Sequence, residues 1–356
     1  MTISDFTLYE LQKATRNHGM PLEGLAYDVT PIGMHYVLVH YDVPYVSATT
    51  WRLQIDGRVA RSLVLSLDDI RSRPRATKRV TMECAGNGRA RLTPRPRSQP
   101  WLEEAVSTGE WTGIPLASLL QEAGIHDDAV EVVFTGLDRG EQQGHQQLYQ
   151  RALPVEEALR PDVLLAFELN GIALPPQHGF PLRLIVPGWY GMTNVKWLSR
   201  ITVLDKPFWG YQQNVFYRIA AHEDDPGIQL SRMYPRSLMI PPGIPAFETR
   251  ERLVPPGTIT LRGRAWSGWA PISRVEVSAD SGATWAEAEL GAPSGIETWR
   301  TWSFRWTATE GRHELLSRAT DAAGNVQPLE PVWNVHGVAN NAVQRVIVAV
   351  RPDIEG

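Results

Sequence analysis

The sequence contains a single cysteine, Cys84, in 356 residues, so it cannot form an intramolecular disulfide. A haem attachment motif of the Cys-x-x-Cys-His type is excluded for the same reason. The sequence also lacks an apolar run of about 20 residues, the length that crosses a membrane. Residues 1–17 lack the charged start and apolar core of a secretion signal. We therefore expect a cytoplasmic protein, or a periplasmic one if an export signal has been removed.

An excess of basic residues is missing as well. Lys and Arg number 35 against 39 Asp and Glu, which gives a net charge of −4. Nucleic acids and anionic membranes are bound by basic surfaces, so a general affinity for either is excluded. The 43% hydrophobic and 21% charged residues are typical of soluble globular proteins. A chain of this length is sufficient for about two domains.

Methionine is scarce, at seven residues, whereas 13 tryptophans and 27 prolines are present. Proline breaks helices and tryptophan suits half-buried pleated surfaces, so the composition favours a strand-rich and loop-rich protein. Short helices are predicted after the cap residue Ser66, before the cap residue Gly124 and over residues 153–158. Alternation and turn signals predict a hairpin and strands over residues 51–59, 80–82, 130–134, 163–171, 182–186 and 195–203.

The pattern changes after a proline-rich stretch, residues 226–256, which we interpret as irregular and as the boundary between two domains. We therefore predict domains over residues 1–225 and 226–356. In the second domain, short strands alternate with tight turns, which is typical of an immunoglobulin-type β-sandwich. The expected strands lie at residues 259–266, 272–278, 284–290, 299–306, 313–319 and 344–350.

Cys84 stands between a predicted strand end and the turn at residues 85–88, a position that presents a side chain at the end of a sheet. Arg89 and Arg91 follow it, and nearby cations favour the thiolate, which acts as a nucleophile or metal ligand. A lone cysteine is more often a small buried hydrophobic residue. Taken alone, this stretch leaves both interpretations open.

Two longer motifs decide between them. Residues 83–89, Glu-Cys-Ala-Gly-Asn-Gly-Arg, resemble the Cys-Ala-Gly-Asn-Arg-Arg signature of the sulfite oxidase family of molybdenum enzymes, with Gly88 where the family usually has Arg. Residues 178–198 resemble the family's His-Gly-Phe-Pro-x-Arg … Val-Lys-Trp-Leu block. Shorter matches occur at residues 16–18, 136–138 and 333–341. The resemblance covers nearly the whole chain in the right order.

This resemblance implies an α+β fold, in which a mixed α/β molybdopterin-binding domain of the sulfite oxidase type precedes an immunoglobulin-like β-sandwich that mediates dimerisation. It implies molybdenum held by the dithiolene of one pyranopterin, with Cys84 as the only protein ligand, a soft donor that suits a sulfur-rich site. The planar guanidinium group of Arg183 and the point charge of the Lys196 ammonium group are suited to bind a phosphate group. The cofactor-binding residues implied are Asn17, His18, Asp138, His178, Arg183, Asn194, Val195 and Lys196.

The family's activity is the oxidation of sulfite to sulfate by oxygen-atom transfer, with electrons passed to a separate acceptor such as a cytochrome. By resemblance, Arg16 and Arg89 supply positive charge to the substrate pocket and Trp101 forms one wall. Tyr217 is expected to hydrogen-bond the oxo group or the product, with Tyr211 as the alternative. The catalytic set implied is Arg16, Arg89, Trp101, Tyr217 and His336.

Two departures from the family's sequence pattern weaken the prediction that sulfite is the substrate. His336 and Thr193 stand where many sulfite oxidases have Arg. An unperturbed imidazole loses its charge near pH 6.5, so we expect sulfite affinity to fall as the pH rises through neutrality. A nitrate reductase-like or other oxo-transfer enzyme of the same fold is therefore an alternative. A cofactor-free β-sandwich binding protein is the alternative from another class.

Overall fold

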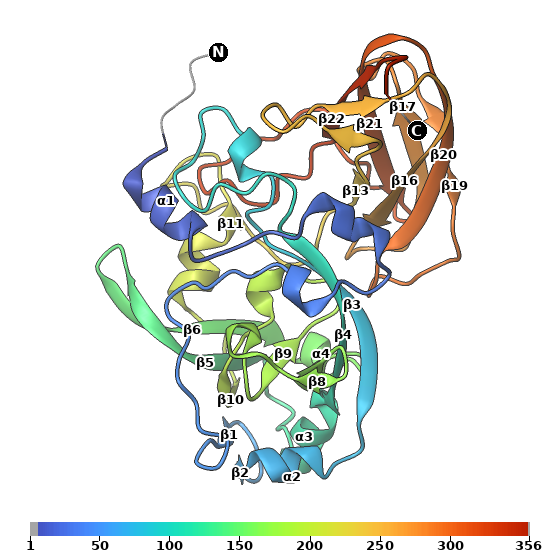
Figure 1. The fold of residues 1–356 in the computed structure, drawn as a ribbon. Coiled ribbons are helices and arrows are strands. Elements are labelled where there is room, and N and C mark those ends of the chain that lie inside the picture. The colour runs from blue at the N-terminus through green and yellow to red at the C-terminus, as the bar shows by residue number, and fades with distance from the viewer. Residues whose placement is uncertain (1–5, 355–356) are drawn as a thin grey trace.

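The computed structural model describes residues 6–354, and its strand pairing separates the chain into two parts. The N-terminal part contains two five-stranded sheets, and the C-terminal part contains two packed sheets, drawn in orange and red in Figure 1. This is the expected mixed domain followed by a β-sandwich. The predicted boundary between residues 225 and 226 stays a prediction.

The first sheet has the order β2-β1-β10-β5-β6, with β1 parallel to β10 and the other pairs antiparallel. Its apolar face packs on the helices at the bottom of Figure 1, because alternate residues of each strand point to that side. The strands are β1 Leu53–Gly57, β2 Leu63–Leu65, β5 Glu131–Gln142, β6 His145–Pro154 and β10 Leu198–Leu204.

The second sheet has the order β3-β4-β7-β8, with β9 paired to β7. The predicted turn at Asn170 and Gly171 is confirmed: both residues have positive φ and connect β7 to β8. The strands are β3 Ala76–Glu83, β4 Val106–Pro115, β7 Leu164–Leu169, β8 Ile172–Ala173 and β9 Arg183–Ile185.

The helices are short, as the composition predicts. Ser66 caps α2 through a capping box with Asp69, and Gly124 ends α3 with a φ of 71°. The α-helices are α1 Leu8–Ala14, α2 Leu67–Arg71, α3 Leu116–Ala123 and α4 Val155–Ala158. The 3₁₀ turns are η1 Leu22–Ala26, η2 Ile32–Met34, η3 Arg89–Arg91, η4 Pro176–His178 and η5 Gly191–Thr193, and η6 Gln212–Phe216 is a π-helix. None of the helices in residues 6–354 is long and apolar enough to span a membrane.

The sandwich packs a sheet of order β13-β16-β20-β19 on one of order β14-β15-β22-β21-β17-β18. Its core contains inward-facing residues of both sheets, including Leu261, Trp302 and Val348. The strands are β13 Arg236–Met239, β14 Ile244–Pro245, β15 Arg252–Val254, β16 Gly257–Trp266, β17 Ile272–Ser278, β18 Ala286–Glu287, β19 Glu289–Leu290, β20 Arg300–Ala308, β21 Gly311–Asp321 and β22 Gln344–Val350.

Four expectations about local structure need correction. The stretch 226–256 is not irregular, because it contains β12 Ile228–Gln229, which pairs with β11 Arg218–Ile219, and also β13, β14 and β15. Proline is tolerated there because β13 and β14 lie at sheet edges. Leu153 belongs to β6, so the helix begins only at Val155. The strand predicted over residues 195–203 begins only at Leu198, since Trp197 has a φ of 50°.

The fourth correction concerns the strand predicted over residues 130–134, which is longer than expected and includes Asp138. Strand β5 continues to Gln142, and its pairing with β6 shifts register between Thr135 and Arg139. Asp138 therefore lies in a bulge, where the extra residue re-aims a side chain out of the regular alternation. The bulge directs its buried carboxyl group toward a cavity that also reaches Cys84.

Candidate functional site

Cys84 follows the last residue of β3 and lies where two cavities meet. Its backbone N–H donates to the Ala105 carbonyl at 2.8 Å, and 6% of the residue is exposed. Burial raises the pKa of the thiol, while the charge of Arg89 and the Gly86 N–H act in the opposite direction. Cys84 and Tyr217 both line an inner and an outer cavity. The thiol can therefore face a ligand held in one cavity and a substrate entering through the other.

The inner cavity contains about 650 Å³ of empty space, part of it open to solvent. The polar residues around it come from β5, η4, β9 and the loop before β10, which are brought together by the pairing of β9 with β7 and of β10 with β5. Five of them belong to the predicted cofactor-binding set: Asp138, His178, Arg183, Asn194 and Lys196.

Arg183 is a buried cation on β9. Its guanidinium donates to the His178 carbonyl at 3.2 Å and to the Asn194 carbonyl at 3.3 Å, and it lies 4.9 Å from the centre of the Trp111 ring. Its Nε has no hydrogen-bond partner, and it forms no ion pair with a carboxylate in residues 6–354. Burial lowers its pKa to about 10, so it remains charged at neutral pH.

His178 and His35 lie edge to face, with ring centres 5.0 Å apart, on the wall of the same cavity. Burial lowers the pKa of His178 to about 2 and that of His35 to about 3, so both imidazoles are neutral at pH 7. The Nε2 atom of each ring is buried without a partner. A neutral imidazole can donate one hydrogen bond and accept another, so both rings can bind a polar ligand edge.

Asp138 and Lys196 complete the polar wall. The Lys196 ammonium group donates to the Leu38 carbonyl at 2.7 Å and the Gln177 carbonyl at 3.1 Å, while one Asp138 oxygen is buried without a partner. Burial lowers the pKa of Lys196 and raises that of Asp138, because each loses the solvation of its charged form. An anionic group near Lys196 would restore the charged ammonium form.

The outer cavity carries mostly positive charge. Arg89 is 3% exposed, donates to the Gln99 carbonyl at 3.0 Å and the His336 carbonyl at 3.3 Å, and has no carboxylate partner in the described chain. Arg16 is half-exposed and pairs with Asp42 at 3.1 Å. The charged residues that line this cavity are Lys13, Arg16, Arg89, Arg97 and Glu141, beside Asn17 and Trp101.

Tyr217 follows the π-helix η6 and is 4% exposed. Burial raises its pKa, so its hydroxyl group is a proton donor at neutral pH. Arg151 lies beneath it, 5.7 Å from the ring centre, and donates to the Gln212 carbonyl at 2.7 Å. Tyr211, the alternative, lies in a third cavity with His336. The structure therefore brings Tyr217, and not Tyr211, to Cys84.

The remaining predicted residues fall into two groups. Asn17, Asn194 and Val195 bond within the protein: Asn17 accepts from the Val39 N–H, Asn194 from the Val186 N–H and the Val195 carbonyl from the Leu184 N–H. His18 is exposed and absent from the residues that line the inner and outer cavities. His336 lines the third cavity and is absent from the residues that line the inner and outer cavities. Their roles stay predictions.

Sequence reasoning missed the segment that leads from residue 35 to residue 40. His35, Tyr36, Leu38 and His40 all line the inner cavity, and Leu38 and His40 also line the outer one. This segment has no strand or helix after η2, so no periodicity marked it. The close spacing of two of the nine histidines was the available signal.

The residues present fit a molybdopterin-type group. Buried polar atoms are normally hydrogen-bonded, yet His35 Nε2, Asp138 Oδ1, His178 Nε2 and Arg183 Nε have no protein partner. They share one cavity with Lys196, which interacts with the Asp138 carboxyl group at longer range but forms no close ion pair within residues 6–354. A group with an anionic end and a hydrogen-bonding edge would satisfy both the donors and the charge. The Cys84 thiol at the cavity's end is a soft metal ligand.

Comparison with known proteins defines the class. The family described as oxidoreductase molybdopterin binding domain matches residues 40–212, and the Mo-co oxidoreductase dimerisation domain matches residues 246–351. The chain thus contains a molybdopterin-binding domain of the oxidoreductase type and a dimerisation-type domain. It is 36% identical to chicken sulfite oxidase over 347 residues, which cover 89% of this chain and 72% of the relative. The chain belongs to the sulfite oxidase family.

Other matches agree with this assignment. Human mitochondrial sulfite oxidase is 35% identical over 91% of this chain, and the chain spans 62% of that relative's length. Plant nitrate reductases also match, at 32% identity for the tomato protein, of which 41% is covered. Among solved structures, the sulfane dehydrogenase SoxCD from Paracoccus pantotrophus superposes with a TM-score of 0.80 and 26% identity, over 99% of this chain and 89% of that chain.

Proposed function

We propose that this protein oxidises sulfite to sulfate, using molybdenum held by the dithiolene of one pyranopterin and by Cys84. The observation that carries this proposal is the arrangement of buried basic groups without a close carboxylate partner on both sides of Cys84, Arg183 and Lys196 in the inner cavity and Arg89 in the outer one. When bound, the cofactor supplies a redox metal that can transfer an oxygen atom. The protein's own residues bind the cofactor, orient the substrate and donate a hydrogen bond to its oxygen.

In the inner cavity, Arg183 and Lys196 bind the anionic end of the pterin cofactor. Arg183 offers its unpartnered Nε and Lys196 a point charge. His35 and His178 bind the pterin edge through their free Nε2 atoms, and Asp138 accepts from its amino groups. One cavity with a single cluster of cations supports one pyranopterin rather than two.

In the outer cavity, Arg89 attracts the sulfite anion and holds it near Cys84, with Lys13, Arg16 and Arg97 guiding anions from the mouth. Trp101 closes one side and keeps water from the reacting atoms. Tyr217 donates its hydroxyl proton in a hydrogen bond to the substrate or product oxygen, because its raised pKa keeps that proton in place.

Electrons are expected to leave to a separate protein such as a cytochrome, and the sandwich domain is expected to form a homodimer. The match of residues 246–351 to a dimerisation domain supports the second expectation. The protein is expected to act in the cytoplasm, or in the periplasm if an export signal has been removed.

Steady-state kinetics test the proposal. Purified protein should reduce ferricyanide or cytochrome c when sulfite is added, and should not oxidise reduced viologen when nitrate or a sulfoxide is added. Faster reduction of nitrate or a sulfoxide than oxidation of sulfite would favour the nitrate reductase-like alternative. The absence of all these activities from molybdenum-loaded protein would contradict the proposal.

A second candidate is oxidation of sulfane sulfur, as the name of the matched SoxCD structure suggests for that protein. The outer cavity shares Arg97, Ser98, Gln143 and Phe216 with the third cavity, so the path from Cys84 continues beyond the space that sulfite needs. A substrate presented on a larger molecule would use this path. Persulfide substrates assayed beside sulfite, with the same acceptor, distinguish the two by their kcat/KM values.

A further inference from the structure

Glu83, the residue before Cys84, is a buried carboxylate that the sandwich domain binds. It is 2% exposed and receives hydrogen bonds or ion-pair contacts from three side chains. Asn87 Nδ2 and Arg236 Nη1 each lie 2.9 Å from Oε1, and Trp266 Nε1 lies 3.0 Å from Oε2. Arg236 belongs to β13 and Trp266 to β16, so two of the three contacting side chains come from the second domain.

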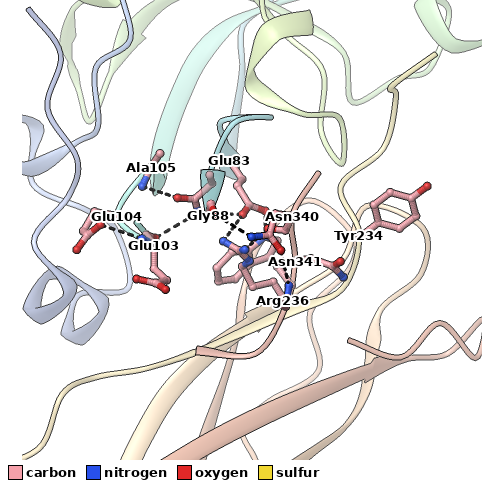
Figure 2. A network of polar contacts seen from close by, with 12 residues as sticks. Glu83, Gly88, Glu103, Glu104, Ala105, Tyr234, Arg236, Asn340 and Asn341 are labelled. Carbon is pink, nitrogen blue, oxygen red and sulfur yellow. Dashed lines mark hydrogen bonds and ion pairs between the residues drawn. The ribbon is translucent and has the colours of Figure 1, made fainter. Parts of the chain in front are cut away.

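The same domain also binds the other end of the Cys84 loop, which we define as residues 84–88. The Arg236 guanidinium donates to the Asn340 carbonyl, and the Asn340 side chain donates to the Gly88 carbonyl at 2.8 Å. Figure 2 shows Arg236 between Glu83 and Asn340, with Gly88 beside them. The Ala339 N–H adds a bond of 2.7 Å to the Ala85 carbonyl.

The backbone conformation of Gly88 and its lack of a side chain allow this contact. Its φ of 82° lies in the left-handed region that favours glycine. A Cβ atom at this position would lie 2.9 Å from Asn340 Nδ2 and 3.1 Å from Arg236 Nη2. The departure from the signature at Gly88 therefore coincides with the place where the second domain approaches the loop. A larger residue at this position would have to push Arg236 or Asn340 away.

Since Glu83 and Arg236 are 3% and 2% exposed at their side chains, each would be a buried unpaired charge without the other. We propose that Arg236 and Asn340 are positioning residues for Cys84: they hold Glu83 and Gly88, and so fix the thiol at the junction of the two cavities. The sandwich domain is then a structural part of the metal site, in addition to its dimerisation role. This inference rests on the proposed function in so far as Cys84 is taken as the metal ligand.

The single cysteine gives a direct measurement of loop position. Cys84 is the only thiol in the chain, so mass spectrometry of the peptide that contains it, after brief treatment of the purified full chain with iodoacetamide, reports how often this loop opens. The variants are Arg236→Met, Glu83→Gln, the double variant with both changes, and Asn340→Ala, which leaves the ion pair intact. Arg318→Met is the matched control, because Arg318 forms a 3.0 Å ion pair with Glu276 in the same domain and has no contact with the loop.

We expect Arg236→Met and Glu83→Gln to raise the alkylation rate of Cys84 and the rate of molybdenum loss by about tenfold or more, because each leaves a buried charge unpaired. Asn340→Ala should raise both rates by a smaller factor. The double variant should lie closer to wild type than either single variant. Arg318→Met should stay within about twofold of wild type, as expected for a partly exposed pair.

Equal rates in wild type, Arg236→Met and Asn340→Ala would overturn the inference. So would an equal increase in Arg318→Met at the same loss of thermal stability, because the effect would then reflect general unfolding. The alkylation rates are compared on metal-free protein for all variants, because a metal-bound thiolate is protected from alkylation. A wild-type protein without molybdenum would thus contradict the proposed function, while the alkylation rates would still decide whether Arg236 and Asn340 position the loop.

Discussion

The two sides of Cys84 differ in whether their buried charged side chains are paired within the protein. On the side of the sandwich domain, the Glu83 carboxylate is paired with Arg236 and bonded by Trp266 and Asn87. On the side of the cavities, Arg183 and Arg89 are equally buried but have no carboxylate partner in residues 6–354. On the first side the buried charges are paired within the protein, whereas on the second side they are available to pair with a bound ligand.

This difference follows from one physical rule. A buried charge is costly unless it is paired and hydrogen-bonded, so a native fold pairs it or reserves it for a bound group. The unpartnered Nε2 atoms of His35 and His178 lie on the cavity side, in agreement with this interpretation. Substitutions on the two sides should therefore separate cofactor binding from folding.

The largest effect is expected from Arg183→Met. The substitution removes the guanidinium group from the inner cavity, together with its stacking on Trp111, so molybdenum per purified chain should fall about tenfold or more. The cofactor-free chain should lose at most about 1–2 kcal/mol, the value of its bonds to two carbonyl groups. Elemental analysis and urea unfolding measure the two quantities. Arg200→Met, at an exposed ion pair on β10, is the control that should retain its metal. Full metal content in Arg183→Met would contradict the assignment of the cavity.

On the side of the sandwich domain, a substitution should reduce the stability of the fold in the presence and absence of the cofactor. Arg236→Met should lower the free energy of unfolding by about 3–5 kcal/mol, because Glu83 would be left buried and unpaired. The change should be found in cofactor-free and loaded protein alike, as measured by urea unfolding monitored by circular dichroism. Comparable stability of Arg183→Met and Arg236→Met without the cofactor would remove the distinction between the two sides.

A smaller effect is expected from Tyr217→Phe. Removal of its hydroxyl should lower kcat/KM for sulfite by about tenfold, the value of one hydrogen bond of about 1.4 kcal/mol, without changing the metal content. Tyr211→Phe is the matched control, since Tyr211 lies in the third cavity and bonds Gln143. If Tyr211→Phe had the larger effect, Tyr211 and not Tyr217 would be the residue that hydrogen-bonds the substrate.

The smallest effect concerns pH. Burial lowers the pKa of His336, and Arg89 and Arg218 lower it further against the opposing charge of Glu223. Its positive charge is therefore present only below its usual pKa and is lost as the pH rises through the lowered value. The KM for sulfite should rise by a few fold as the pH rises through this lowered pKa and stay constant above neutrality, because an unperturbed imidazole already loses its charge near pH 6.5. In His336→Ala this rise should disappear. A pH-independent KM in wild type, equal to that of the variant, would show that His336 has no part in substrate binding.

The sequence predicted regular elements better than the surroundings of the site. Five of the predicted sandwich strands and the caps at Ser66 and Gly124 follow from local alternation and turn residues, and were confirmed. The strand predicted over residues 284–290 is instead two short strands, β18 and β19, which belong to different sheets. Strand β6 was missed, and the course of β5 beyond residue 134 was not predicted, because the bulge at Asp138 interrupts the alternation.

The cavity wall was harder to predict, because its residues meet only through long-range strand pairing. Cys84, Asp138, His178, Arg183 and Lys196 were found through motifs, and the structure brings them together. His35 and His40 were not found, since their segment has neither periodicity nor a motif. Glu83 lies inside the signature, but its partner Arg236 is 153 positions away, and no local pattern connects the two.

Molybdenum per chain, measured by elemental analysis in wild type and Cys84→Ser made in a host that synthesises the pterin, tests the central claim most directly. The account predicts a value near one for wild type and a much lower value for the variant, because the hydroxyl group is a poor substitute for a soft thiolate ligand. Equal metal content in both proteins would contradict the role of Cys84. Persistent absence of molybdenum from wild type would contradict the enzyme assignment and favour a cofactor-free binding protein.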